Sequence, residues 1–128
     1  MDDQTLVERF EALTLAPADF GHREHVRVAF AMLRDADFGE AAVRYRRALR
    51  AFAAAAGAAT KYHETITWAY LTVVHQRMAE HPCETSEEFL LRNADLLDAV
   101  GALAPHYDLA ELVASPIARR LFVLPGRR

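Results

Sequence analysis

The stretch EAAVRYRRALRAFAAAAG, residues 40–57, decides the class of fold. It is rich in alanine, which is the best helix former. Its apolar side chains recur at the spacing of one helical face, at Tyr45, Ala48, Leu49 and Phe52. Gly57 follows the last periodic residue, as is common just past the end of a helix. The stretch therefore predicts a helix over about residues 40–56.

The same periodicity extends outward from this helix in both directions. We expect helices over about 3–13, 22–34 and 60–80, separated by turns that contain proline or glycine. Shorter helices are expected with Thr85 or Ser86 as the cap, after Asn93 or Asp95, and after Ser115, where Ser115-Pro116 is a typical start signal. The chain is thus predicted to be all-α. Four main helices with short connections suggest an up-down four-helix bundle core with short C-terminal helices against its side or end.

Length and composition exclude several classes of protein. A chain of 128 residues with 52% hydrophobic and 26% charged residues predicts one globular domain over 1–128. A net charge of -3 gives no general attraction to nucleic acid. The acidic opening does not resemble a signal peptide, and the longest apolar run, 51–59, is too short to cross a bilayer. The single cysteine, Cys83, cannot form an internal disulfide, so we expect a cytoplasmic protein. A homodimer through the alanine-rich helix is compatible with the sequence.

Two histidine-containing clusters carry the candidate chemistry. The first is GHREHVR, residues 21–27, in which His22 and His25 are three apart and so share a helical face. The second is KYHETITW, residues 61–68, which contains His63 and Glu64. In an up-down bundle the helices over 22–34 and 60–80 run parallel, so both clusters are expected at the same end of the bundle.

Such a convergence predicts a metal site. Two or three imidazoles and a carboxylate suit zinc, iron or copper. The first hypothesis is a small metal-dependent enzyme that acts on a small organic molecule, with His22, His25 and His63 as ligands of one transition metal ion. Glu64 would be a fourth ligand or a general base on bound water. Helix N-termini disfavour a cation, however, and the imidazoles could instead hold a carboxylate or phosphate.

Neighbouring residues fit supporting roles in such a site. Tyr62 and Thr67 are candidate catalytic residues that would hydrogen-bond a substrate or orient a ligand. Trp68 and Tyr70 would form the wall of an apolar pocket, or plain core. Lys61 is either a cationic anchor for the substrate or a solvated residue at a helix start.

Two other hypotheses keep the pocket without the metal. In the first, His63 and Glu64 form an acid–base pair in a metal-free enzyme, because histidine titrates near neutral pH. In the second, the protein is not an enzyme but a helical module that binds a ligand or a partner helix, and its histidines satisfy buried polar groups. A loss of stability on replacing His63 would favour the second.

Three strings of the sequence resemble a group of small bacterial helical proteins. They are HREHVRVA at 22–29, KYHETIT at 61–67, and ASPIAR with FVLP at 114–125. The resemblance covers most of the chain and implies a stand-alone bacterial protein. It implies no particular activity, cofactor or substrate.

Overall fold

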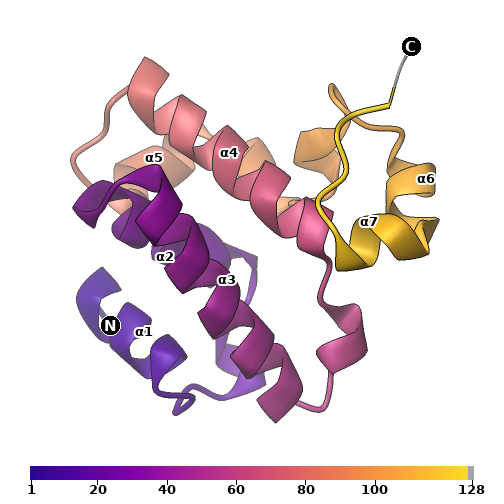
Figure 1. Ribbon diagram of the computed structural model, residues 1–128. Helices are drawn as coiled ribbons and strands as arrows, with labels where there is room; N and C mark the ends of the chain where they lie inside the picture. Colours follow the sequence, from indigo (N-terminus) through magenta and orange to yellow (C-terminus); the bar gives the residue numbers. More distant parts are fainter. Residues whose placement is uncertain (127–128) are drawn as a thin grey trace.

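The computed structural model describes residues 1–126 and confirms the all-α class (Figure 1). Over these residues the α-helices are α1 (Asp3–Glu11), α2 (His22–Asp35), α3 (Phe38–Ala55), α4 (Glu64–Glu80), α5 (Ser86–Arg92), α6 (Leu109–Ala114) and α7 (Pro116–Arg120). Short 3-10 helices are η1 (Pro17–Asp19), η2 (Ala59–Lys61), η3 (Ala94–Leu97) and η4 (Gly101–Leu103). No helix in this part of the chain combines the length and the apolar character needed to span a membrane.

Capping residues set most helix ends. Ser115 caps α7 as predicted, and Thr85, one of the two predicted candidates, caps α5. Gly57 follows α3 with a φ of 72°, which a residue without a Cβ adopts readily. α3 begins earlier than predicted because the Asp37 carboxylate accepts the Glu40 N–H and caps it. α4 begins later than predicted, at Glu64, because His63 is its N-cap residue.

The helices pack in a different arrangement from a regular bundle. α3 and α4 run in opposite directions and are joined by the η2 turn (Figure 1). α1 packs against α2 and α3, whereas α4 packs against α2, α3, η4 and α7. The up-down four-helix bundle is therefore not confirmed: the nine-residue α1 covers α2 and α3, and C-terminal elements cover the remaining face of α4.

Two hydrophobic clusters form the interior. The larger one lies among α1 to α5 and contains stacked or tilted aromatic pairs, including Phe10 with Phe20 and Phe30 with Phe89. The smaller one joins Ala69 of α4 to Leu103, Leu112 and other residues of the C-terminal region. α4 contributes to both clusters, so its placement fixes how the C-terminal region sits on the rest of the protein.

Polar contacts hold the C-terminal region on the first turn of α4. The buried Thr65 hydroxyl lies 2.8 and 2.7 Å from the carbonyl oxygens of Ala118 and Leu121, and it accepts the Val123 N–H at 3.0 Å. The Arg119 guanidinium donates to the Thr60 carbonyl at 3.1 Å. We call this set of contacts the C-terminal clasp. It brings the 61–67 and 114–125 strings into direct contact.

Replacing Thr65 tests the clasp. Thr65→Val keeps the shape of the side chain but leaves buried backbone groups without their partner, so we expect a loss of about 2 kcal/mol in the free energy of unfolding. Urea denaturation measures it. Thr72→Val is the matched control, since the Thr72 hydroxyl also bonds backbone but is exposed, and its effect should stay within about 0.5 kcal/mol. Equal effects of the two variants would contradict the clasp.

Candidate functional site

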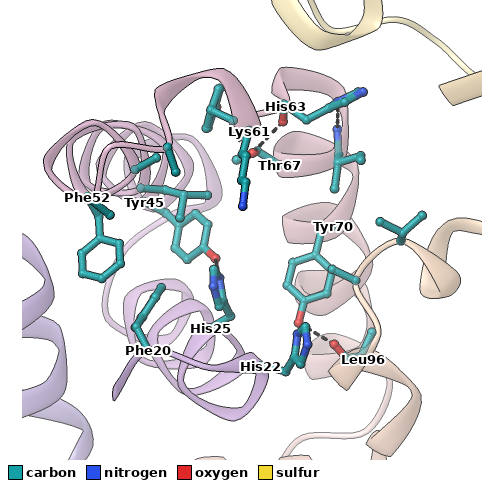
Figure 2. A pocket seen from close by; sticks show the side chains of 18 of the residues that line it. Phe20, His22, His25, Tyr45, Phe52, Lys61, His63, Thr67, Tyr70 and Leu96 are labelled. Carbon is teal, nitrogen blue, oxygen red and sulfur yellow. Dashed lines mark hydrogen bonds between the residues drawn. The ribbon is translucent and has the colours of Figure 1, made fainter. Parts of the chain in front are cut away.

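A cavity of about 500 Å³ lies between the start of α2, the second half of α3, the start of α4 and the segment from Leu96 to Val100 (Figure 2). Most of its wall is apolar. Phe20, Leu49, Phe52, Ile66 and Leu97 contribute the larger apolar side chains, and alanines of α3 the smaller ones. Its polar members are histidines, tyrosines, Lys61 and Thr67.

His22 and His25 line the cavity from the first turn of α2, as their spacing predicted. His22 is exposed, whereas His25 is partly buried, with its ring 4.2 Å from that of Phe20 between centroids. Burial, and secondarily the charge of His22, lowers the pKa of His25 to about 4, with Glu24 acting in the opposite direction. His25 is therefore a neutral imidazole at neutral pH.

A tyrosine hydroxyl determines which nitrogen of His25 carries the proton. The Nδ1 atom lies 3.2 Å from the hydroxyl of the buried Tyr45. Within the described residues this hydroxyl has no other hydrogen-bond partner, so it donates to Nδ1 and the proton of His25 lies on Nε2. Every fully buried side-chain nitrogen or oxygen in this part of the chain has a partner, and Nε2 has none. Nε2 is therefore not fully buried, and His25 lines the cavity.

His63 has a structural role, which the sequence left open as an alternative to metal binding. It is only 6% exposed and lies at the opposite end of the cavity from His22 and His25 (Figure 2). Its Nδ1 accepts the Ile66 N–H at 3.1 Å and caps α4, while Nε2 donates to the Leu112 carbonyl at 2.9 Å. Burial lowers the pKa of His63, and the nearby Arg119 charge acts in the same direction. Both ring nitrogens are thus occupied.

The Glu64 carboxylate is likewise hydrogen-bonded to other residues of the protein. Its carboxylate accepts hydrogen bonds from the Arg46 guanidinium at 2.9 Å, the Tyr62 hydroxyl at 2.7 Å and the Trp68 indole at 3.2 Å. Burial alone would raise the pKa of Glu64, but these hydrogen bonds outweigh it and lower the pKa. A carboxylate held as an anion by three donors is a weak proton acceptor, and it does not line the cavity.

Tyr62 and Thr67 line the cavity, but their hydroxyl groups donate hydrogen bonds to other groups of the protein. Tyr62 donates to Glu64, and burial raises the pKa of Tyr62 to about 12. Thr67 donates to the His63 carbonyl at 2.8 Å, within the first turn of α4. Trp68, expected as a possible wall, instead bonds Glu64, whereas Tyr70 does line the cavity and donates to the Leu96 carbonyl.

The structure does not bring the four expected metal ligands together. His22 and His25 share one end of the cavity, His63 lies at the other end, and Glu64 faces Arg46. Among residues 1–126 no group of three or more His, Cys, Asp or Glu side chains is placed to hold a metal ion. The physical reason is that His63 precedes α4 as its cap, so its ring turns back onto the helix end rather than along the face expected for a first-turn residue.

Sequence reasoning missed two features of the site. Tyr45 was assigned to the core, yet its hydroxyl orients His25 across 20 residues of sequence. The segment from Leu96 to Val100 was not expected at the site at all, although it forms one wall. Both contacts join distant parts of the chain, and no local sequence pattern predicts them.

His63→Ala tests the structural role of this residue. The variant removes a helix cap and leaves the buried Leu112 carbonyl without its donor, so we expect it to lose about 2 to 3 kcal/mol in the free energy of unfolding. Urea denaturation followed by circular dichroism measures the loss. His106→Ala, at an exposed position, is the control and should change stability little. A fully stable His63→Ala protein would contradict the assignment.

The lowered pKa of His25 predicts a pH dependence of stability. The unfolded chain takes up a proton on this residue near pH 6.5, whereas the folded protein does so only near pH 4. Stability from this source is therefore complete above about pH 6.5 and falls by on the order of 3 kcal/mol as the pH drops to 4. Urea denaturation across this range should show a shallower pH slope for His25→Gln than for the wild type. Parallel profiles would refute the prediction.

Comparisons with known proteins assign no family to the chain. No family model, curated protein or solved structure matches it. The cavity and the residues that line it carry the functional inference.

Proposed function

We propose that this protein binds a small, largely apolar organic molecule in the cavity bounded by α2, α3, α4 and the segment from Leu96 to Val100. One observation carries the proposal: a cavity of about 500 Å³ has mostly apolar walls and a few polar groups that converge on it. Binding sites for small molecules typically have this size and this composition.

The roles of the polar residues favour binding over the two enzyme hypotheses. An acid–base pair of His63 and Glu64 would need groups free to exchange protons with a substrate, and both are fully engaged in hydrogen bonds. A metal site of His22, His25 and His63, with Glu64 as a ligand or base, would need these side chains to converge. His63 lies at the other end of the cavity from His22 and His25, and Glu64 does not line the cavity. A binding module needs neither condition.

The apolar wall supplies the driving force for such binding. Removing apolar surface from water is worth roughly 25 cal/mol per Å². A ligand that buries about 200 Å² of apolar surface would therefore gain on the order of 5 kcal/mol before the costs of immobilisation. The larger apolar side chains that offer this surface are Phe20, Leu49, Phe52, Ile66 and Leu97.

Filling the cavity tests the proposal. A neutral fluorophore that brightens in apolar surroundings, such as N-phenyl-1-naphthylamine, should bind the wild-type protein saturably with one site per chain. Ala53 lines the cavity, so Ala53→Phe should weaken this binding by about tenfold or more, because the new ring takes up the ligand's space. Fluorescence titration measures the dissociation constant.

Ala51→Phe is the matched control, because Ala51 is exposed on the same helix and lies outside the cavity. It should bind the fluorophore as the wild type does. Absence of saturable binding, or equal weakening by both variants, would refute the proposal.

A further inference from the structure

The charge that lines the cavity is of one sign only, positive. Among residues 1–126 no Asp or Glu lines the cavity, and the one permanently charged residue in its wall is Lys61. Lys61 is also the only lysine of the chain, since the other fourteen basic residues are arginines. The whole protein carries a net charge of -3, so the positive character of the cavity is a local feature.

Within the described residues Lys61 has no protein partner, unlike two of the arginines of the neighbouring helix. Arg44 and Arg46 of α3 are paired with Glu11 and Glu64. Within residues 1–126, Lys61 forms no ion pair and its ammonium group makes no hydrogen bond. Figure 2 shows its side chain extending from the η2 turn into the cavity. The ammonium is thus available to a ligand.

His25 supplies a second donor to the same space. Tyr45 occupies Nδ1, whereas Nε2 is not fully buried and has no partner within the described residues, and His25 lines the cavity. His22 lies beside it at the N-terminus of α2, where the helix dipole adds partial positive charge. A cationic group and a neutral N–H donor therefore face one cavity.

Two of the carboxylates that neighbour lining residues in sequence are held by other groups of the protein. Glu64 is held by Arg46, Tyr62 and Trp68. Glu24 accepts the Gly21 N–H at 2.9 Å, at the start of α2. Neither lines the cavity, so neither competes with a ligand for Lys61.

We infer that the ligand is an apolar molecule bearing a single carboxylate, with Lys61 as its counter-charge and His25 as a hydrogen-bond donor. The inference rests on the proposed binding function and deepens it. A monoanion fits better than a phosphate, because one ammonium group and one neutral donor within apolar walls would leave a second negative charge poorly compensated.

A pair of probes that differ only in the head group tests the inference. Decanoate and decan-1-ol are each titrated against the neutral fluorophore by displacement. Because a hydrogen bond to a charged group is worth more than one to a neutral group, we expect wild-type protein to bind decanoate about tenfold tighter than decanol. Lys61→Met should remove this preference and leave decanol binding nearly unchanged, whereas Lys61→Arg should retain most of it.

Arg47→Met is the matched control for net charge, because Arg47 is exposed on α3, lies outside the cavity and pairs with no acidic side chain of residues 1–126. It should keep the full preference for decanoate. Equal binding of the two probes to wild type, or equal loss in Lys61→Met and Arg47→Met, would overturn the inference while leaving the binding function intact. Binding of neither probe, together with a fluorophore that does not bind, would overturn both.

A second measurement uses the unmodified protein and does not depend on the folding of a variant. Because Lys61 is the only lysine, acetylation of a lysine side chain by an amine-reactive reagent reports on this residue alone, and peptide mass spectrometry separates it from the N-terminal amine. Saturating decanoate should slow acetylation of Lys61 several-fold more than saturating decanol does. Equal protection by the two probes would overturn the inference.

Discussion

The hydrogen bonds of His63 connect the start of α4 to the C-terminal region. One ring nitrogen caps α4, and the other reaches the Leu112 carbonyl of α6. The start of a helix leaves several N–H groups without partners, and at a buried helix end these must be satisfied by side chains. Because α4 contributes to both hydrophobic clusters, the bond that fixes its first turn also fixes the relative position of the two clusters.

The polar string around His63 has mainly a structural function. Glu64 reaches back to Arg46 of α3, and Thr65 reaches forward to backbone carbonyls within α7 and directly after it. Each of these side chains finds its partner in a different part of the chain. The density of polar residues that suggests a catalytic centre in the sequence is therefore explained by a junction at which several backbone segments meet with little water to solvate them.

Polar groups without a protein partner, rather than those already hydrogen-bonded, identify the residues that a ligand would contact. Polar groups that are already hydrogen-bonded within the protein cannot also bind a ligand without breaking a bond that stabilises the fold. Lys61 and His25 line an apolar cavity, and the Lys61 ammonium and Nε2 of His25 have no partner within the described residues. Ligand recognition is consequently assigned to Lys61 and His25, while the neighbouring His63 and Glu64 keep the wall of the cavity in place.

The sequence by itself determined the helical class, most helix positions, the cap at Ser115, and the shared face of His22 and His25, because helix propensity, capping and periodicity act over a few residues. Only the tertiary structure decided how the helices pack and what each polar residue does. His63 caps α4 through Ile66, which is close in sequence, but its second bond, to Leu112, joins distant parts of the chain. Tyr45 meets His25, and the segment from Leu96 to Val100 closes the cavity, through contacts between distant parts of the chain. Such contacts depend on how whole helices pack, and local sequence patterns carry no information about that packing.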